Sequence, residues 1–206
     1  SKQWWVTMKH LSAHIIDKLI SKGNITEDER ELYIYGLFIS ISHLMYLILA
    51  IVFGLIFKCF LESVIFYIAF HFIRGYAGGY HAKTETRCEI LSTLSILCCI
   101  VLIKLSKMYD IRIALLSISL VFAVLIFILC PLDTPEKPLN DKEYKYFRKI
   151  SWIILSLIIV AIIVSFIFKF NVVFAPCCAS LILEGVLIGT GKIKKVYNEK
   201  RASSPA

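Results

Sequence analysis

A histidine and a cysteine, His81 and Cys88, stand seven residues apart in a short polar stretch between two apolar runs. A cysteine thiolate is a strong nucleophile, and a neighbouring imidazole can take up a proton and return it. Side chains paired in this way attack the carbonyl carbon of a peptide bond or an acyl group. Because apolar runs flank the stretch, we expect it at a membrane surface, facing a membrane-bound substrate.

The polar stretch 74–88 is rich in glycine and reads RGYAGGYHAKTETRC. Glycine adopts backbone conformations that other residues resist, so a tight turn here would bring the histidine back toward the cysteine. Free backbone N–H groups in such a turn would form an oxyanion hole for the developing negative charge. Four residues are therefore expected to shape the loop: Arg74, Gly75, Gly78 and Gly79.

Cys88 is also expected to stand at the beginning of a helix. Thr86 and Glu89 have the spacing of a capping box, which would place Cys88 in the first helical turn. Unpaired N–H groups at a helix N-terminus and the neighbouring cation of Arg87 both favour a thiolate. The spacing alone is a weak signal, because surface histidines and unreactive thiols are common. Cys88 is preferred over Cys130, the next candidate, because it alone is expected in water after a glycine-rich turn.

The elements that would hold this stretch are membrane-spanning helices. The 206-residue chain is 58% hydrophobic, with several apolar runs near the length needed to cross a bilayer. We therefore predict an all-α integral membrane protein, with one domain over residues 1–201 and a disordered tail at 202–206. The second span is short and requires tilt or local thinning of the bilayer. Six transmembrane spans are expected, at 32–57, 60–73, 90–103, 111–130, 150–168 and 172–188.

Residues 3–22 have the pattern of an amphipathic helix ahead of the spans. Apolar side chains recur at helical spacing, tryptophans stand at the start and lysines lie on the polar side. Basic amphipathic helices of this kind lie in the membrane interface; the alternative is packing against the rest of the protein. Thr26 and Glu29 have capping-box spacing before the first span. The first apolar residues are spaced rather than continuous, so no cleavable signal peptide is expected.

Six spans place both termini on one side of the membrane, together with the loops 74–88 and 131–149. Of the 23 lysines and arginines, 18 fall on that side and 5 on the other. Positively charged loops face the cytoplasm, so both termini and both loops are expected to be cytoplasmic. This asymmetry also explains the formal charge of +8, which therefore does not indicate a nucleic-acid partner.

The sequence contains no pattern for a metal or a cofactor. Its seven cysteines include no C-x-x-C pair, and there is no H-E-x-x-H or paired-aspartate motif. A metal-dependent intramembrane protease is therefore set aside. His43 and His71 are interpreted as helix-packing residues, because no further ligands converge with them in the sequence.

Two motifs resemble those of a known family. The core pattern of the AgrB proteins, accessory gene regulator B of Gram-positive bacteria, is matched at Arg74, Gly78, Gly79, His81 and Cys88. A second signature of that family is similar to PLDTP at 131–135, followed by KPL at 137–139. The resemblance extends over essentially the whole chain, with the interfacial N-terminus, the six spans and both loops where the family has them.

This resemblance implies a cysteine endopeptidase of the bacterial cell membrane that matures a quorum-sensing peptide. The family's substrate is an AgrD-like propeptide with an amphipathic leader, a short signal segment and an acidic C-terminal tail. By resemblance, Cys88 would attack the peptide bond before the tail and form an acyl-enzyme thioester, with His81 as base and then acid. A nucleophile in the signal segment would capture the acyl group as a thiolactone or lactone. Family members act as homo-oligomers, which implies a homodimer in the membrane lipid.

Charged residues near the pair are candidates for binding this substrate. Positive charge suits an acidic tail, and the positive-inside rule alone explains it equally well. The groups that would orient His81 are Glu85, Glu89, Asp133 or Glu184. Glu184 stands out because an ionisable residue within a span is costly, although snorkelling or pairing with a tail lysine would also explain it. The substrate-binding candidates are Lys83, Arg87, Asp133, Lys137, Lys142 and Glu184.

A membrane peptide carrier or exporter subunit without enzymatic activity is the alternative function. Such a protein would need polar residues along a path between its spans, and the sequence offers few of them. It would also retain its activity in the Cys88→Ala variant, which the peptidase would not.

Overall fold

The computed structural model describes residues 2–21, 26–80, 84–133 and 139–203. Within these ranges it leaves the side chains of residues 2–9, 85, 202 and 203 undescribed. Three predicted site residues, His81, Lys83 and Lys137, lie outside the described residues, as does half of the predicted second signature.

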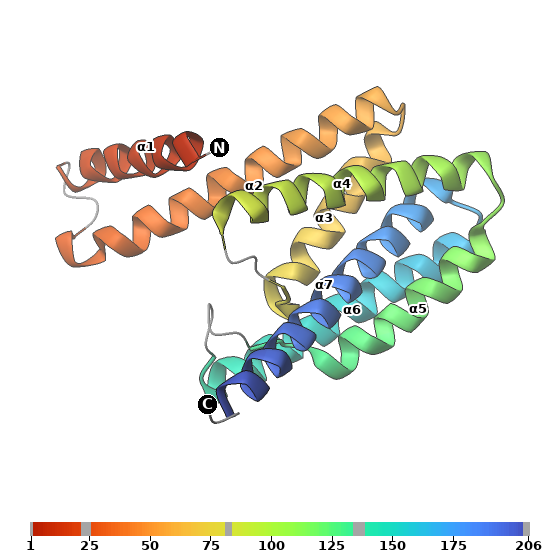
Figure 1. Ribbon diagram of the computed structural model, residues 1–206. Helices are drawn as coiled ribbons and strands as arrows, with labels where there is room; N and C mark the ends of the chain where they lie inside the picture. Colours follow the sequence, from red (N-terminus) through yellow and green to blue (C-terminus); the bar gives the residue numbers. More distant parts are fainter. Residues whose placement is uncertain (1, 22–25, 81–83, 134–138, 204–206) are drawn as a thin grey trace. The chain divides into compact units, whose positions relative to one another are not determined.

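The described chain is helical, which confirms the predicted all-α class (Figure 1). Within the described ranges no strand forms, and a single isolated parallel bridge pairs Gly78 with Leu132. The helices are α1 (Lys2–Ile20), the 3-10 helix η1 (Glu27–Glu29), α2 (Arg30–Ile56), α3 (Phe60–Ala77), α4 (Glu85–Met108), α5 (Arg112–Leu129), α6 (Asp141–Ile167) and α7 (Asn171–Ser203).

Five helices of the described chain are long and apolar enough to cross a membrane, namely α2, α4, α5, α6 and α7. This confirms an integral membrane protein. The remaining expected span, the second at 60–73, corresponds to α3, an 18-residue helix that carries Glu62 and Arg74 and is not among the five. The count of six spans therefore stays a prediction.

The helix ends agree with the sequence in two places and differ in two. The Glu29 carboxylate accepts hydrogen bonds from the Thr26 N–H (3.4 Å) and hydroxyl (2.8 Å), as the capping-box spacing predicts. Cys130 has extended backbone ahead of Pro131, as a stop after α5 requires. The predicted disordered tail at 202–206 is wrong for its first two residues, because α7 continues to Ser203.

The start of α4 is the other difference. Thr86 is not the cap but the second residue of a helix that begins at Glu85. The cap is formed by Thr84, whose Oγ1 accepts the N–H of Arg87 at 3.4 Å. Thr84 has the same hydroxyl chemistry as Thr86, and the sequence pattern selected Thr86 because a glutamate happens to follow it three residues later.

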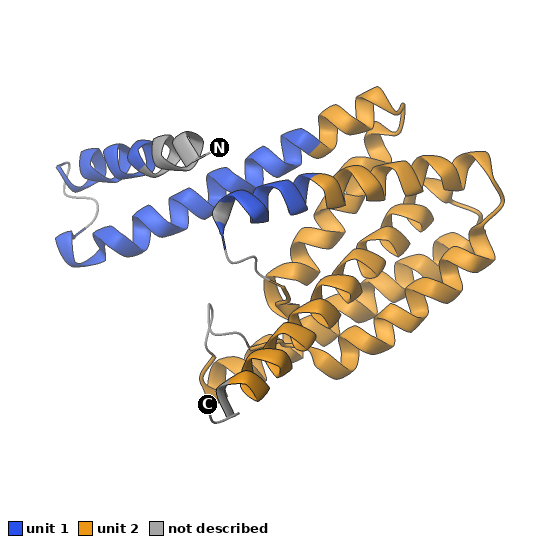
Figure 2. Cartoon of the chain, in the orientation of Figure 1, with its two compact units in different colours: residues 1–49, 82–93 blue, residues 50–81, 94–206 orange. Residues whose placement is uncertain are grey.

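The chain divides into two compact units (Figure 2). Unit 1 comprises residues 1–49 and 82–93, and unit 2 comprises residues 50–81 and 94–206. In unit 1, Arg30 at the start of α2 forms an ion pair with Asp17 of α1 at 2.8 Å. This contact ties the amphipathic helix to the first span. The expectation of a single domain over 1–201 stays a prediction.

Unit 2 is built around α7, which packs against α3, α5 and α6. Small residues let the helices approach closely: a Cβ on Gly185 would overlap the ring of Phe122 in α5. One face of α7 is consequently buried along much of its length, including Ala175, Cys178, Ala179, Leu181, Glu184 and Ile188.

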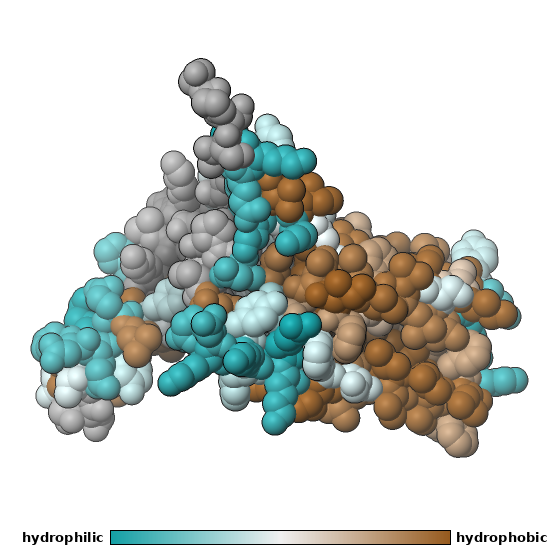
Figure 3. All heavy atoms as spheres, turned by 90° about the horizontal axis from the view of Figure 1, so that it is seen from below, coloured by the Kyte–Doolittle hydropathy of each residue, from teal (hydrophilic) through white to brown (hydrophobic). Residues whose placement is uncertain are grey.

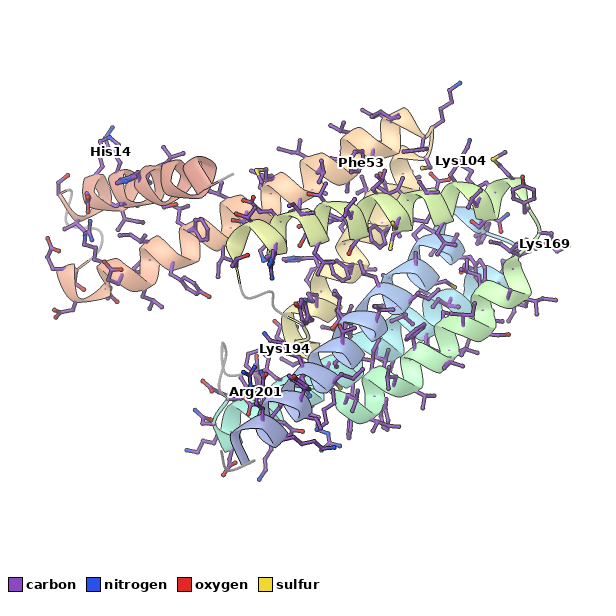
Figure 4. All side chains as sticks on the ribbon, in the orientation of Figure 1. His14, Phe53, Lys104, Lys169, Lys194 and Arg201 are labelled. Atoms are coloured by element: carbon purple, nitrogen blue, oxygen red, sulfur yellow. The ribbon has the colours of Figure 1, made fainter. Side chains whose placement is uncertain are left out.

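Charged and apolar side chains separate along unit 2. In Figure 3, apolar side chains cover the bodies of α5 and α6, and hydrophilic ones gather where α6 begins and α7 ends. In Figure 4, Lys194 and Arg201 stand at one end of unit 2, and Lys104 and Lys169 stand at the other. The first pair lies in the C-terminal tail that is expected in the cytoplasm, and the second pair directly follows two expected spans, 90–103 and 150–168, where the chain is expected on the other side of the membrane; the sidedness stays a prediction.

Candidate active site

Arg74 organises the glycine turn. It lies near the end of α3, and its guanidinium reaches forward along the chain: Nη1 donates to the carbonyl of Gly78, and Nη2 donates to the carbonyl of Tyr80 at 2.7 Å. The N–H of Gly78 donates back to the Arg74 carbonyl at 3.3 Å, where the helix ends. The guanidinium therefore closes a turn whose last residue directly precedes His81 in the sequence.

Two of the three expected glycines are required by this turn. Gly78 and Gly79 have φ values of 77° and 139°, a region that favours glycine. A Cβ on Gly78 would stand 2.8 Å from the carbonyl oxygen of Leu132, and a Cβ on Gly79 would overlap Nη1 of Arg74. Neither position accepts a side chain without rearrangement.

Gly75 has a different role from the one predicted. It is an exposed residue within α3, and a Cβ there would meet nothing within 4 Å. The expectation that Gly75 shapes the loop is therefore wrong. The expected oxyanion hole is also unsupported at two positions, because the N–H groups of Gly78 and Tyr80 already donate to the carbonyls of Arg74 and Leu187.

The turn is docked on α7 and on the segment that follows α5. The N–H of Tyr80 donates to the Leu187 carbonyl at 2.9 Å, and the N–H of Leu132 donates to the Ala77 carbonyl at 2.9 Å. Gly191 permits the close approach, since a Cβ there would lie 2.9 Å from the Tyr80 nitrogen. These backbone bonds fix the turn to two other parts of unit 2.

Two lysines of α7 hold the same two segments. Lys195 Nζ lies 3.5 Å from the Asp133 carboxylate and donates to the Asp133 carbonyl at 3.2 Å. Lys194 Nζ lies 5.3 Å from the centroid of the Tyr80 ring. The Asp133 carboxylate also accepts the N–H of Leu139 at 3.2 Å. Asp133 thus has structural partners, and its predicted contact with a substrate or with His81 stays a prediction.

Among the candidate orienting groups whose side chains the structure describes, Glu184 is the fully buried one, with 0% exposure. Its carboxylate lies 4.0 Å from Arg74 Nη1. In the described part of the chain, neither carboxylate oxygen has a hydrogen-bond partner. The alternatives from the sequence, snorkelling and a tail lysine, are both wrong, because the side chain is enclosed and its neighbouring cation comes from α3.

Cys88 is the fourth residue of α4, and its N–H donates to the Thr84 carbonyl at 3.1 Å. Side chains on a helix tilt toward its N-terminus, so this thiol leans over the first turn. The helix dipole favours negative charge there. The thiol is partly exposed, as a nucleophile must be.

The other six cysteines are less suitable. All seven lie in the described ranges, and Cys130, the second choice from the sequence, has 0% exposure. Cys98 is exposed but lies in the middle of α4, far from either end of the span. The buried thiols are Cys59, Cys99, Cys130, Cys177 and Cys178.

The surroundings of Cys88 in unit 1 include residues that the sequence did not indicate. Tyr46 of α2 lies near Ser92, Cys88 and Glu89 of α4. Glu89 has one buried carboxylate oxygen without a hydrogen-bond partner in the described chain. A tyrosine inside an apolar run is unremarkable in a sequence, and only the fold of unit 1 brings it near the start of α4.

The remaining predicted residues are solvent-facing or undescribed. Arg87 and Lys142 are exposed, near the N-termini of α4 and α6. The pairing of His81 with Cys88 stays a prediction, because His81 is outside the described residues. No group of three or more His, Cys, Asp or Glu side chains in the described chain is arranged to hold a metal ion.

Comparison with known proteins gives one consistent family. The family model for accessory gene regulator B matches residues 12–188. An AgrB-like protein of Clostridium perfringens strain SM101 is 30% identical over 170 residues, which cover 80% of this chain and 79% of that protein. A second AgrB-like protein, from strain 13 of the same species, is 29% identical over the same shares.

A more distant relative has a different name. The protein FsrB of Enterococcus faecalis is 30% identical over 156 residues, which cover 76% of this chain and 58% of that protein. No solved structure matches the chain. The family match spans both the glycine turn and Cys88, and it ends one helical turn beyond Glu184. The chain therefore belongs to the AgrB family, the membrane proteins that process autoinducing peptides in quorum sensing.

Proposed function

We propose that this protein is a cysteine endopeptidase that removes the acidic C-terminal tail of an AgrD-like propeptide in the bacterial cell membrane. The observation that carries the proposal is the position of Cys88. It is partly exposed at the N-terminal end of α4, while Cys130 and four others are buried and Cys98 lies mid-span. His81 follows a turn that Arg74 holds closed.

The chemistry has two steps. The Cys88 thiolate adds to the carbonyl carbon of the bond before the tail, and the C–N bond breaks as His81 gives its proton to the leaving amine. The signal segment is then held as a thioester on Cys88. A thiol or hydroxyl of the same segment, deprotonated by His81, attacks that thioester, and the ring closes as Cys88 leaves as thiolate. No oxidant, reductant or metal is consumed.

Cyclisation is favoured over hydrolysis by proximity. A thioester retains much of the acyl-transfer potential of the peptide bond, and a nucleophile held within the same bound peptide has a large effective concentration. Basic residues near the site are suited to the departing acidic tail. Arg87 and Lys142 are exposed and available for this contact, with Lys83 and Lys137 as further candidates.

The proposal places both termini and the catalytic loop in the cytoplasm and makes the working form a homodimer. The separation of Lys194 and Arg201 from Lys104 and Lys169 supports the sidedness within unit 2. The homodimer rests on the family resemblance alone.

The test uses the purified full chain in lipid vesicles with a propeptide from the same organism. Tail release and a covalent adduct are followed by mass spectrometry for the wild type, Cys88→Ser and His81→Ala. Cys98→Ser is the matched control, because it changes an exposed thiol of the same helix away from the proposed site. We expect an adduct on Cys88, loss of cleavage in the first two variants and full cleavage in the control.

Cleavage by Cys88→Ser at the wild-type rate would refute the nucleophile. Normal cleavage by His81→Ala would refute the base. If the wild type binds the propeptide and transports it across the vesicle membrane without cutting it, the protein is a carrier instead.

A further inference from the structure

We propose that Glu184 is a positioning residue of the active site, acting through Arg74 on the turn that leads into His81. This inference rests on the proposed function, since it assigns His81 the role of base. Glu184 itself touches neither the thiol nor the substrate in this assignment. Its role is to hold the guanidinium that shapes the loop.

The first observation is the state of Glu184. Its side chain is completely buried in α7, and neither carboxylate oxygen is hydrogen-bonded within the described chain. Burying an ionisable group without hydrogen bonds is costly, and more so within a membrane span. A carboxylate kept under these conditions needs a specific partner, and the cation beside it is Arg74, at 4.0 Å.

The second observation concerns the hydrogen bonds that the Arg74 guanidinium donates. Its guanidinium is 20% exposed and donates to the carbonyls of Gly78 and Tyr80. Arginine keeps its charge in proteins, so the buried pair is neutral overall only when Glu184 is ionised. The two carbonyls fix the orientation of the guanidinium through hydrogen bonds, and the Glu184 carboxylate lies beside it.

The third observation is the face of α7 that receives the turn. Glu184, Leu187 and Gly191 stand at positions i, i+3 and i+7, which lie on one side of a helix. Leu187 accepts the N–H of Tyr80 at 2.9 Å, and Gly191 leaves room for the Tyr80 nitrogen. One face of α7 therefore supplies the carboxylate beside Arg74, the carbonyl that accepts the Tyr80 N–H and the space for the Tyr80 nitrogen.

Removing the carboxylate should release this arrangement. In Glu184→Gln the side chain keeps its shape, but the guanidinium loses the carboxylate beside it. It is then drawn to water or to other acceptors, and the carbonyls of Gly78 and Tyr80 lose their donor. Because other residues contact the substrate's acidic tail in the proposed mechanism, we expect kcat to fall while KM stays within about twofold. Misplacement of a catalytic group by about 1 Å costs up to roughly 100-fold in rate, so kcat should fall about 10- to 100-fold.

The matched control is Glu62→Gln. Glu62 is the other buried glutamate in the described part of unit 2, and it forms an ion pair with Lys107 at 2.5 Å. It stands in the first turn of α3, whereas Arg74 stands in the last. Both substitutions replace the carboxylate of a buried glutamate by an amide, and only the one at 184 should lower kcat.

A cycle of variants separates a positioning role from a general loss of structure. The full chain in lipid vesicles is assayed as wild type, Glu184→Gln, His81→Ala and the double variant. If Glu184 acts through His81, Glu184→Gln lowers kcat in the wild type and has no further effect on the residual rate of His81→Ala. An equal loss in both backgrounds would overturn the proposal, as would a Glu184→Gln enzyme within twofold of the wild type.

A second double variant covers the case in which Glu184→Gln does not accumulate. Arg74→Gln with Glu184→Gln removes both charges of the pair and should insert and fold. We expect it to be as slow as Arg74→Gln alone, and wild-type activity in it would refute the inference. Failure of the proposed function is a separate result, because it would appear as normal cleavage by Cys88→Ser or His81→Ala.

Discussion

Alanine substitutions at Gly79 and Gly75 test whether the turn after α3 has the structure described. Gly79 has a φ of 139°, and its Cβ would overlap Arg74 Nη1. A non-glycine residue in such a backbone region costs about 1–3 kcal/mol, and forcing an atom into a filled space costs about 1–3 kcal/mol more. Gly79→Ala should therefore destabilise the closed turn by about 2–6 kcal/mol and displace the guanidinium.

Gly75→Ala provides the opposite expectation four residues away. Gly75 is exposed within α3, with nothing within 4 Å of the added Cβ. Alanine is the better helix former by about 0.5–1 kcal/mol, so the variant should be as stable as the wild type or slightly more stable. Its tail-cleaving activity should be unchanged.

Both variants are assayed for tail release in lipid vesicles and for thermal unfolding in the same detergent. Gly79→Ala is expected to lose at least tenfold in kcat, because the turn that precedes His81 opens. Hydrogen exchange at the Tyr80 amide, which donates to Leu187 at 2.9 Å, reports the opening directly. Equal activity in the two variants, or protection of the Tyr80 amide in Gly79→Ala, would refute the account of the turn.

Two further contacts lead to measurable expectations. Lys107→Gln leaves the buried carboxylate of Glu62 without its ion pair. We therefore expect the free energy of unfolding in detergent to fall by about 1–3 kcal/mol. Lys104→Gln in the same helix is the control and should leave that stability nearly unchanged. The hydrogen bond from Arg30 lowers the pKa of Asp17 below its ordinary value. The link between α1 and α2 is therefore fully present above about pH 3.9, the pKa of an aspartate in the unfolded chain, and is lost as the pH falls through the lower pKa of Asp17 in the folded protein. Hydrogen exchange of α1 between pH 6 and pH 3 should show this release, and Asp17→Asn should show it already at pH 6; an α1 equally protected at both pH values in the wild type would contradict it.

The sequence predicted the helices well because each apolar run carries its own signal. Length and hydropathy locate α2, α4, α5, α6 and α7, and Pro131 marks the end of α5. Local chemistry was less decisive at helix ends. Thr84 and Thr86 are both good caps in the sequence, and the choice between them depends on which backbone N–H each hydroxyl reaches.

Glycines show the same limit at the candidate site. Gly75, Gly78 and Gly79 are alike in the sequence, but the first is a helical residue and the other two have left-handed backbone. What separates them is where α3 ends, and Arg74 sets that end by turning its guanidinium toward the carbonyls of Gly78 and Tyr80. Hydrogen bonds between a long polar side chain and the residues that follow it produce no periodic pattern in the sequence.

Glu184 illustrates why buried pairs are hard to infer from sequence in a membrane protein. A charge within a span indicates a function or a partner, and tail lysines of α7 are the cations closest to it along the chain. The partner in the structure is instead Arg74, 110 residues earlier in the sequence. Tail lysines are excluded by the direction of the side chain, which points into the packing of α7 on α3 rather than toward the helix end. Lys194 and Lys195 contact Tyr80 and Asp133 instead. The α7 helix thus separates its ionisable groups by depth. Near its C-terminal end, Lys194 and Lys195 contact the loops. Within the packed helices, Glu184 lies beside Arg74, which closes the turn.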